Sequence, residues 1–378
     1  MVAPLETIGL YVHIPFCQKK CHYCDFLTFS EAEEKMEPYV DYLVKELALY
    51  SGRYQLDTIY FGGGTPSYLE EEQMGRIMEA IYHHFTVIDD CEISIEMNPE
   101  SITKSKIQTY LKYGFNRYSM GVQSFDDATL KMMGRLHDRQ TVFEKIDLLQ
   151  QAGIDRLGID LMFANPKQTM QVLKEDIATA VTLPINHISY YSLMIKDNTP
   201  FQRWILTGQI RLVEDELERQ MYHYIQDQLT QHGFTQYEIS NFAKQGMESR
   251  HNKKYWQLEN YLGVGLGASS NLDLVRFVNH RRFADYFDSI DQGVPPIQSR
   301  EILTLEDREK EYIMLHLRLL KGFEFVDINR RFGIDFQTKY QSVLTKHQRL
   351  GLIDFNQERV WFTDYGLDIG NQFYLDII

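Results

Sequence analysis

The chain has 378 residues, of which 44% are hydrophobic and 24% charged, a composition typical of a soluble globular protein with a large core. Its net charge of −14 and pI of about 5.3 argue against a nucleic-acid-binding protein, because binding to phosphates requires a basic face. No apolar run reaches the roughly 20 residues of a membrane span and no signal peptide is recognisable, so we expect a cytoplasmic protein that makes at most peripheral contact with membranes.

Short β-branched or aromatic runs alternate with amphipathic stretches in the first 200 residues. Helices are predicted at 39–50, 72–85 and 104–114, and strands at 8–14, 58–61, 92–97, 117–122, 156–163 and 187–193. This alternation is typical of βαβ units with a parallel sheet. Six units predict an α/β fold in which residues 1–200 form a partial (β/α)6 TIM-like barrel, with its chemistry at the C-terminal ends of the strands.

The second half of the chain is predicted to contain an extension and a small domain. Residues 201–300 would extend the barrel, with a helix at 213–233, a strand at 235–240, an aromatic and polar stretch at 250–270, and a loop with a boundary at Pro295–Pro296. Residues 301–378 open with Thr304 and Asp307 at capping-box spacing and predict a small winged-helix-like domain. That domain holds ten basic and thirteen acidic residues, a net charge of −3, which favours docking over DNA binding.

Three cysteines, Cys17, Cys21 and Cys24, follow the first predicted strand in the pattern C-x3-C-x2-C. In a loop three thiolates can converge on one point, and in a reducing compartment such a group favours metal binding over disulfides. The spacing matches neither a zinc ribbon, which needs two C-x2-C pairs, nor a ferredoxin, which supplies a fourth cysteine. An iron–sulfur cluster with one open iron would suit three thiolates, and a zinc site is the alternative. The remaining Cys91 is expected to be a small buried residue.

Glycines and polar residues mark the ends of the later strands. The consecutive glycines of FGGGTP, residues 61–66, would let the backbone approach a ligand closely, although a strained turn is the alternative. Glu96, Gln123 and Asp160 end the third, fourth and fifth strands, and Arg135 lies in GRLHDR. Because the C-terminal ends of parallel strands share one rim, these residues predict a polar ring at the barrel mouth. Carboxylates there could hold hydroxyls, and an arginine could pair with a carboxylate.

These motifs resemble those of the radical S-adenosylmethionine (SAM) superfamily. In that superfamily three cysteines hold a [4Fe–4S] cluster whose fourth iron binds the amino and carboxylate groups of SAM. The resemblance is closest to the oxygen-independent coproporphyrinogen III oxidase family, at YVHIPFCQKKCHYCDF, IYFGGGTPS, YSMGVQSFDDATLKMMGR and GIDLMFANPKQT. It implies cluster ligands Cys17, Cys21 and Cys24, and a SAM site lined by Tyr11, Tyr23, Gly63, Gly64, Thr65, Glu96, Gln123, Arg135 and Asp160.

Two subfamilies share these residues. The oxidases usually carry one more cysteine two places after the third, where this chain has Phe26, and an N-terminal extension that is not expected here because the first strand begins near residue 8. Haem chaperones of the HemW type are instead marked by H-N-x-x-Y-W, which stands here as His251, Asn252, Tyr255 and Trp256. Phe26 and this motif favour the chaperone subfamily.

The resemblance implies that His251 is a candidate haem ligand, since neutral imidazole is a common axial donor to haem iron. Its helix would carry His251 and Tyr255 on one face. Three neighbouring cations could meet the haem propionates or form a solvated charge run: Arg250, Lys253 and Lys254.

The resulting hypothesis is a haem chaperone that binds haem on an iron–sulfur and SAM scaffold and delivers it to respiratory haem proteins. The alternative is an enzyme that decarboxylates coproporphyrinogen III oxidatively to protoporphyrinogen IX, and a winged-helix sensor of iron–sulfur status is a third interpretation. The expected cofactors are a [4Fe–4S] cluster, SAM and haem. An electron donor would be needed only for catalysis, no nucleic acid is expected, and both a monomer and a homodimer remain open.

Overall fold

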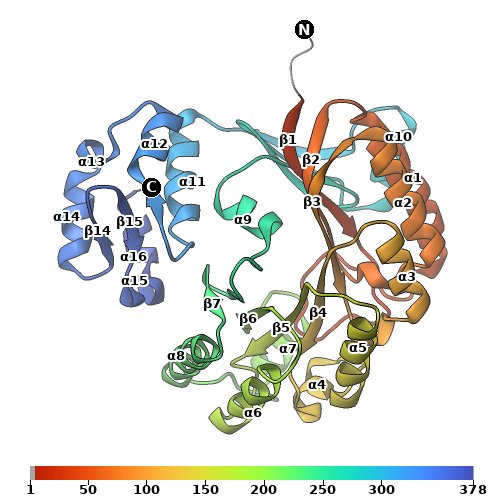
Figure 1. Ribbon diagram of the computed structural model, residues 1–378, viewed down its shortest axis with the longest axis horizontal. Coiled ribbons are helices and arrows are strands. Elements are labelled where there is room, and N and C mark those ends of the chain that lie inside the picture. The colour runs from red at the N-terminus through yellow and green to blue at the C-terminus, as the bar shows by residue number, and fades with distance from the viewer. Residues whose placement is uncertain (1–4, 378) are drawn as a thin grey trace.

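The computed structural model describes residues 5–377, and six parallel strands form its centre (Figure 1). They are β1 (Glu6–Ile14), β2 (Tyr54–Gly63), β3 (Thr86–Met97), β4 (Arg117–Gln123), β5 (Leu157–Phe163) and β6 (His187–Ser192). Each pairs with the next in sequence, from β1 to β6, in parallel register. The six predicted strands are therefore confirmed, most of them longer than the sequence runs suggested.

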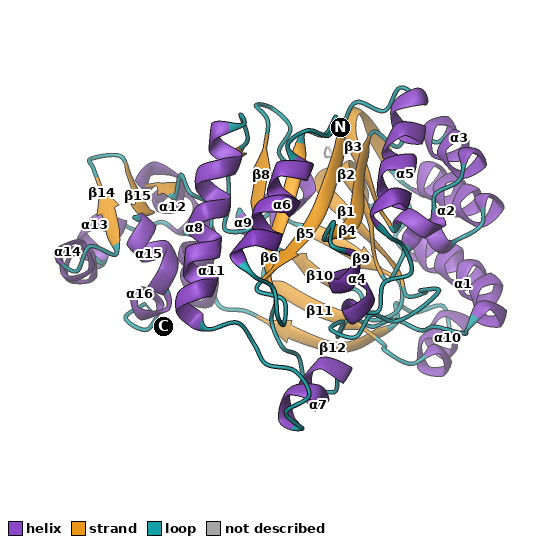
Figure 2. Ribbon diagram, turned by 90° about the horizontal axis from the view of Figure 1, so that it is seen from below, coloured by secondary structure: helices purple, strands orange, loops and turns teal. Residues whose placement is uncertain are grey.

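Helices cover the outer face of the curved sheet (Figure 2). They are α1 (Met36–Leu49), α2 (Glu71–His84), α3 (Lys104–Lys112), α4 (Asp127–Met133), α5 (Arg139–Gln151), α6 (Met170–Ala180) and α8 (Asp215–Gln231). The short α7 (Pro200–Leu206) packs instead against the loop that follows β1, where the Phe201 N–H donates to the His22 carbonyl at 3.1 Å. On β1 the fully buried Ile8, Leu10 and Val12 join one core with α1 residues such as Leu43. The alternate positions of the strand face the concave side, which we call the lumen.

The lumen is lined by polar side chains, whereas a simple packed core would be lined by apolar ones. Inward positions of neighbouring strands include Thr58 and Tyr60 on β2, Glu96 on β3 and Asp160 on β5. The outward positions are apolar, as expected of parallel strands that are covered by helices. This division places functional side chains inside the barrel while the core forms between sheet and helices.

The sheet continues on both sides of the six strands to twelve strands within residues 5–377. Beyond β6 lie β8 (Asn241–Ala243) and β7 (Thr235–Gln236), and beyond β1 lie β9 (Tyr261–Val264), β10 (Ser269–Leu272), β11 (Val275–Asn279) and β12 (Ile297–Ile302). The strand predicted over 235–240 is wrong in extent, because β7 and β8 form a small hairpin and the residues between them turn. The loop at Pro295–Pro296 is confirmed, and it connects α10 (Phe283–Asp291) to β12.

A short helix, α9 (Arg250–Trp256), carries the H-N-x-x-Y-W motif and lies on the concave side of the sheet (Figure 1). Its amino-terminal part points into the lumen, where the His251 backbone N–H donates to Glu92 on β3 at 3.1 Å. Its carboxyl-terminal end reaches the small domain, because Leu258, two residues beyond the helix, belongs to the core of that domain. The helix therefore connects the barrel interior to the C-terminal region.

Residues after Ile302 form a small domain with its own core and a three-stranded antiparallel sheet, ordered β13-β15-β14. Its first helix begins with the predicted capping box between Thr304 and Asp307. The elements are α11 (Leu305–His316), β13 (Phe323–Glu324), α12 (Phe325–Phe332), α13 (Phe336–Lys339), α14 (Gln341–Arg349), β14 (Ile353–Phe355), β15 (Arg359–Phe362), α15 (Asp364–Ile369) and α16 (Asn371–Tyr374). Across residues 5–377, every helix is too short or too polar to cross a bilayer.

Candidate functional site

The three cysteines lie in the loop that follows β1, at the carboxyl end of the parallel strands. Cys17 is buried, Cys21 and Cys24 are half-buried, and all three thiols are free. Burial raises the pKa of the Cys17 thiol to about 11 and also raises the pKa of Cys24. Burial thus disfavours bare thiolates at Cys17 and Cys24, so a positively charged group is needed to hold them deprotonated.

Each cysteine sulfur accepts a hydrogen bond from a different part of the chain. The Thr65 hydroxyl donates to Cys17 Sγ at 3.3 Å, and Arg135 Nη1 donates to Cys21 Sγ at 3.4 Å. Cys24 receives a hydrogen bond from the backbone N–H of Phe26. Donors directed at sulfur are the usual surroundings of cluster thiolates, because they stabilise the charge that the sulfurs carry.

A cubane cluster makes different geometric demands on its cysteines than a single metal ion makes on its ligands. Within residues 5–377, no three His, Cys, Asp or Glu side chains are close enough together to hold one metal ion. The cysteines of a cubane cluster bind separate irons, so they need not converge as tightly. The Arg135 Nε is buried without a hydrogen-bond partner beside these sulfurs, which leaves a donor for an anionic group.

The glycine loop after β2 packs directly on the cysteine loop. The Gly64 N–H donates to the Ile14 carbonyl at 2.9 Å, and the Thr65 N–H donates to the Phe16 carbonyl at 2.8 Å. A Cβ on Gly64 would lie 2.7 Å from the Phe16 carbonyl oxygen, and Gly63 adopts a φ of +112° against the His13 ring. Both glycines are therefore required for the two loops to meet.

The acidic residues at the strand ends belong to the same mouth. Glu96 accepts hydrogen bonds from the Tyr60 hydroxyl at 2.7 Å and from the Gly63 N–H at 3.3 Å, and burial raises its pKa to about 7. Asp160 accepts from Ser119 at 3.1 Å, and burial raises its pKa as well. Carboxyl groups with raised pKa values in a cleft are typical of ligand-binding sites.

The remaining predicted SAM-site residues lie around these groups. Tyr23 is in the cysteine loop and contacts Cys21. Gln123 ends β4 with a φ of +70°, and its amide is close to Gly121 beside Arg135. Tyr11 is deeper in the lumen, paired with Tyr60 in the β1–β2 register, and its hydroxyl is 3.0 Å from His13 Nδ1.

His251 lies at the opposite end of the lumen from the cysteines. Its ring contacts Thr58 Oγ1 through Nδ1 at 2.8 Å and the Tyr255 hydroxyl through Nε2 at 2.9 Å, and its side chain is 0% exposed. The shared face of His251 and Tyr255 is thereby confirmed. Burial lowers the pKa of His251 to about 3, so the ring is neutral. Thr58 precedes Gly63 by five residues on β2, which separates the two ends by about 16 Å along the strand.

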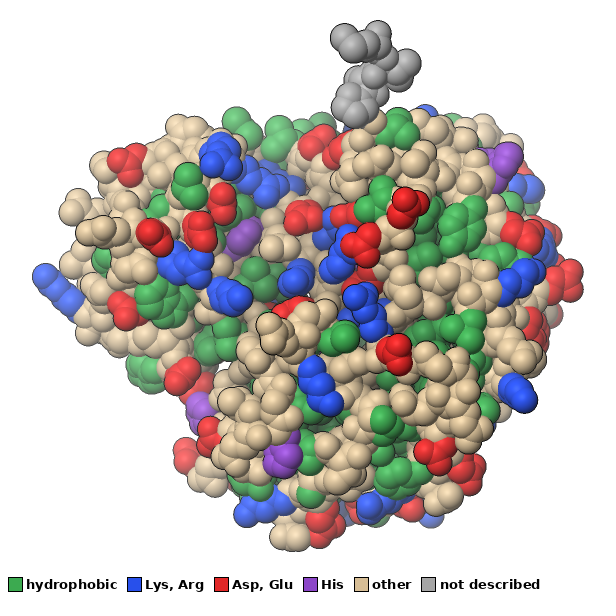
Figure 3. Space-filling view, viewed as in Figure 1, with side chains coloured by type: hydrophobic (Ala, Val, Ile, Leu, Met, Phe, Trp, Pro, Cys, Tyr) green, Lys and Arg blue, Asp and Glu red, His purple; other side chains and the backbone are tan. Residues whose placement is uncertain are grey.

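The cations beside His251 differ in their surroundings. Lys254 is buried and bridges Asp57 at 2.8 Å and Glu259 at 2.7 Å. Arg250 pairs with Asp90 at 3.1 Å. Lys254 is therefore not part of a solvated run, whereas the Arg250–Asp90 pair lies at the surface, with the Asp90 side chain 93% exposed. Figure 3 shows Lys and Arg side chains gathered over the hollowed middle of the face where α9 lies.

Sequence reasoning missed several residues that complete the site. Asn98 bridges Arg135 and Thr65, Tyr60 and Ser119 donate to the two acidic residues, and His13 packs against Gly63. The only sequence signal for Asn98 was its position in EMNPE, two residues after Glu96. The other partners are set by the register between strands, which sequence spacing does not reveal.

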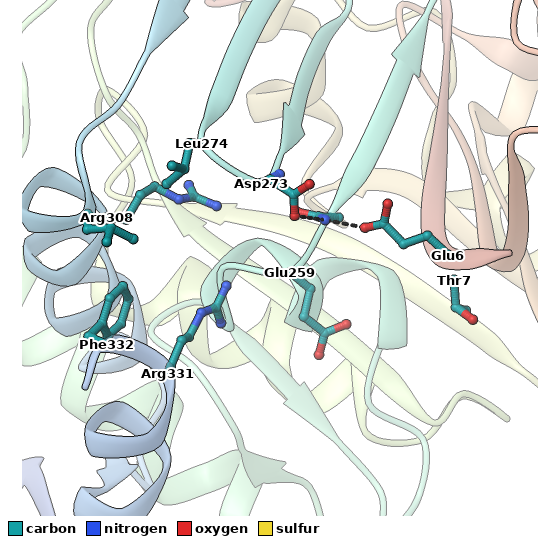
Figure 4. A pocket seen from close by; sticks show the side chains of 10 residues that line it. Glu6, Thr7, Glu259, Asp273, Leu274, Arg308, Arg331 and Phe332 are labelled. Atoms are coloured by element: carbon teal, nitrogen blue, oxygen red, sulfur yellow. Dashed lines mark hydrogen bonds between the residues drawn. The ribbon is translucent and has the colours of Figure 1, made fainter. Parts of the chain in front are cut away.

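Two cavities differ in size and position. A polar cavity of about 40 Å³ lies in the lumen between Tyr60, Glu96, Asp160 and Asn252. A larger cavity of about 350 Å³ lies between the barrel and the small domain (Figure 4). Its barrel side carries Glu6, Glu259 and Asp273, and its other side carries Arg308 and Arg331. The larger cavity contains none of the predicted cluster or SAM residues.

Comparison with known proteins gives two family matches. The radical SAM superfamily matches residues 11–180, and the HemN C-terminal domain matches residues 303–369. A radical SAM domain implies a [4Fe–4S] cluster and SAM, and the three cysteines with their hydrogen-bond donors fit the cluster. The predicted superfamily is therefore confirmed.

Similar proteins span almost the whole chain. The heme chaperone HemW of Bacillus subtilis (strain 168) is 36% identical, and the match covers 96% of this chain and 97% of that protein. HemW of Lactococcus lactis (strain IL1403) is 33% identical over 96% and 95% of the two chains, and HemW of Escherichia coli (strain K12) is 31% identical over 87% of each.

Among solved structures, coproporphyrinogen III oxidase (HemN) from Escherichia coli, described as a radical SAM enzyme, superposes with a TM-score of 0.86. The identity is 22%, and the match covers 99% of this chain and 90% of that one. At this identity the likeness shows the fold alone. It confirms the predicted partial barrel of the radical SAM type with a small C-terminal domain.

Proposed function

Because the chain belongs to the HemW family of heme chaperones, we propose that it binds haem and passes it to haem proteins of the respiratory chain. The observation that carries this proposal is the likeness to those chaperones, which spans nearly the whole of both chains. Phe26 supports it, because this side chain is 63% exposed at the position where the oxidases usually have a further cysteine.

The proposal assigns the cofactors to the residues at the barrel mouth. Cys17, Cys21 and Cys24 would hold the [4Fe–4S] cluster, and the Arg135 guanidinium would pair with the SAM carboxylate. Further SAM contacts would come from Tyr11, Tyr23, Gly63, Gly64, Thr65, Glu96, Gln123 and Asp160. When bound, such a cluster supplies one-electron chemistry to SAM, and this chain's residues would orient the two groups and shield them from water.

We retain His251 as the proposed haem ligand, with a condition set by its contacts. Both ring nitrogens have hydrogen-bond partners, and the side chain is fully buried. An iron–nitrogen bond would therefore have to replace the contact with Tyr255 or with Thr58. Since haem cannot enter the lumen as it stands, ligation would require α9 to withdraw from it.

The alternative function, oxidative decarboxylation of coproporphyrinogen III, has less support because the similar proteins that span nearly the whole chain are heme chaperones. The lumen cavity of about 40 Å³ is far smaller than the roughly 300 Å³ or more that pockets for drug-sized ligands occupy. His251 and Tyr255 lie in this lumen, and a porphyrinogen, like haem, would require α9 to withdraw from it.

Haem titration of the anaerobically reconstituted protein tests the proposal. We expect a stoichiometric Soret band in the wild type, and at least tenfold weaker binding in His251→Ala with iron and sulfide contents unchanged. His83→Ala, which alters an exposed histidine on α2, serves as the matched control and should bind haem like the wild type.

Turnover of coproporphyrinogen III with SAM and a reductant is measured in the same samples. Rates near those of an authentic oxidase would contradict the chaperone proposal. Unchanged haem binding in His251→Ala would remove the ligand assignment and leave the chaperone proposal standing.

The proposed partners follow from the same function. The acceptors would be respiratory haem proteins, the location would be the cytoplasm, and an electron donor would be required only if SAM is cleaved. Sedimentation of the apo- and cluster-loaded protein decides between a monomer and a homodimer.

A further inference from the structure

Asn98, directly after β3, is hydrogen-bonded to both side chains that donate to cysteine sulfurs. Its Nδ2 donates to Thr65 Oγ1 at 3.0 Å, and its Oδ1 accepts from Arg135 Nη2 at 2.7 Å. Thr65 then donates to Cys17 Sγ at 3.3 Å, and Arg135 donates to Cys21 Sγ at 3.4 Å. One amide thus connects two of the three sulfur hydrogen bonds.

The Asn98 backbone is fixed as firmly as its side chain. Its N–H donates to Ser67 Oγ at 3.2 Å, and its carbonyl accepts from the Ser101 N–H at 3.0 Å and the Ser101 hydroxyl at 2.8 Å. Pro99 follows at the start of a short 3-10 helix. The amide plane is therefore held by contacts on both sides of the residue.

The direction of each hydrogen bond requires an amide at this position. The Thr65 hydroxyl has one hydrogen and gives it to Cys17, so Thr65 Oγ1 needs a separate donor, which Asn98 Nδ2 provides. Arg135 has only donors, so it needs an acceptor, which Asn98 Oδ1 provides. A carboxylate would serve Arg135 but would take the Thr65 hydrogen away from Cys17.

We propose that Asn98 is a positioning residue that raises the reduction potential of the cluster by directing Thr65 and Arg135 at Cys17 and Cys21. Hydrogen bonds to cluster sulfurs stabilise the more negative, reduced state. This inference rests on the proposed cluster ligands, but it does not depend on haem binding or on SAM cleavage.

The test is a redox titration of the reconstituted cluster, followed by electron paramagnetic resonance, without haem or SAM. We expect Asn98→Ala to lower the reduced-to-oxidised ratio at a fixed potential by about tenfold, which is about 59 mV for one electron. Asn98→Asp should lower it too, because Cys17 loses its donor and a negative charge is added. Thr65→Val, which removes the hydrogen bond to Cys17 but leaves the one from Arg135 to Cys21, should give a smaller decrease.

A matched control is Asn116→Ala, which removes the same side chain from the opposite end of the strands. The Asn116 amide is also hydrogen-bonded on both sides, to the Ile93 N–H and the Cys91 carbonyl of β3, and touches none of the cluster residues. Its titration curve should coincide with that of the wild type.

A double variant separates a positioning role from a general loss of stability. If Asn98 acts through Thr65, Asn98→Ala should lower the reduced-to-oxidised ratio of the cluster by less in the Thr65→Val background than in the wild type. Additive effects, or a wild-type potential in Asn98→Ala with full iron and sulfide content, would overturn the inference. If Asn98→Ala does not fold, Asn98→Asp and Thr65→Val give the same decision. Failure of haem binding, by contrast, would affect the proposed function and leave these titrations unchanged.

Discussion

Gly63 and Gly64 are constrained in different ways at the barrel mouth. Position 63 requires glycine for its backbone conformation, because other residues rarely adopt its φ of +112°. Position 64 requires glycine because it has no room for a side chain: a Cβ would lie 2.7 Å and 2.9 Å from the carbonyl oxygens of Phe16 and Ile14. Those oxygens belong to the backbone on either side of Pro15, so relieving the clash would shift the cysteine loop.

We therefore predict that Gly64→Ala lowers the free energy of unfolding by about 1–3 kcal/mol and reduces cluster retention. Urea denaturation of the apoprotein and iron content after reconstitution measure the two effects. Gly153→Ala is the control, since Gly153 has a φ of +78° but open space around it. It should lose a similar amount of stability and keep its iron, and equal iron loss in both variants would contradict the prediction.

The chemical groups of the site were easier to predict than their partners. The spacing of Cys17, Cys21 and Cys24 and the polar ends of three strands were visible as departures from ordinary strand and loop composition. Tyr60 was not, because an aromatic residue in a strand is also typical of a packed core. Its role depends on the β2–β3 register, in which Tyr60 lies opposite Ser94 and one inward position from Glu96.

At the scale of elements, α9 occupies the lumen because β1 leaves room for it. A Cβ on Gly9 would lie 2.8 Å from Thr58 Oγ1, 3.1 Å from Lys254 Cδ and 3.3 Å from His251 Cε1. The sequence motif predicted a helix and its shared face, but His251 contacts Thr58 across 193 positions of sequence. No local pattern indicates a contact of that separation, so the location of the helix could not be predicted.

Gly9→Val should displace α9 from the lumen. We expect amide exchange of residues 249–258 to become at least tenfold faster, and the free energy of unfolding to fall by about 1–3 kcal/mol from overpacking. Hydrogen–deuterium exchange measured by mass spectrometry gives the local effect, with α2 as the internal reference. Wild-type exchange in α9 together with a general loss of stability would show that α9 is not held by this contact.

At the scale of the whole molecule, the chain returns to its first strand when β9 pairs with β1, Gly9 opposite Tyr261, and the sheet stays open with β12 and β7 at its edges. The sequence did not predict the pairing of β9 with β1. β1 also pairs with β2, and β9 also pairs with β10, so the composition of the two strands does not identify them as partners. Glu46 of α1 helps to hold the junction. Its carboxylate accepts from the Gly265 N–H at 2.7 Å, from Asn279 Nδ2 at 2.7 Å and from the Tyr286 hydroxyl.

This junction should give the fold a measurable pH dependence. Burial raises the pKa of Glu46 to about 7 from its ordinary value of 4.5, against the opposing effect of its three hydrogen bonds. Between these two values the folded state binds more protons than the unfolded state, so the contribution of Glu46 to stability is complete below pH 4.5 and is lost as the pH rises through 7. The difference between the pKa values of Glu46 in the folded and unfolded states corresponds to about 3 kcal/mol of folding free energy, at 1.36 kcal/mol per pKa unit.

Glu46→Gln removes this titration and keeps an acceptor oxygen for Gly265 and Tyr286, while the loss of the acceptor for Asn279 is independent of pH. We expect the stability of the variant relative to the wild type to increase by about 3 kcal/mol between pH 5 and pH 8, and then to remain constant as the pH rises further. Urea denaturation of both proteins at each pH measures the difference, and using the difference cancels the titration of all other groups. Parallel stability curves would mean that Glu46 is already ionised in the fold at pH 5, with its charge held by Gly265, Asn279 and Tyr286.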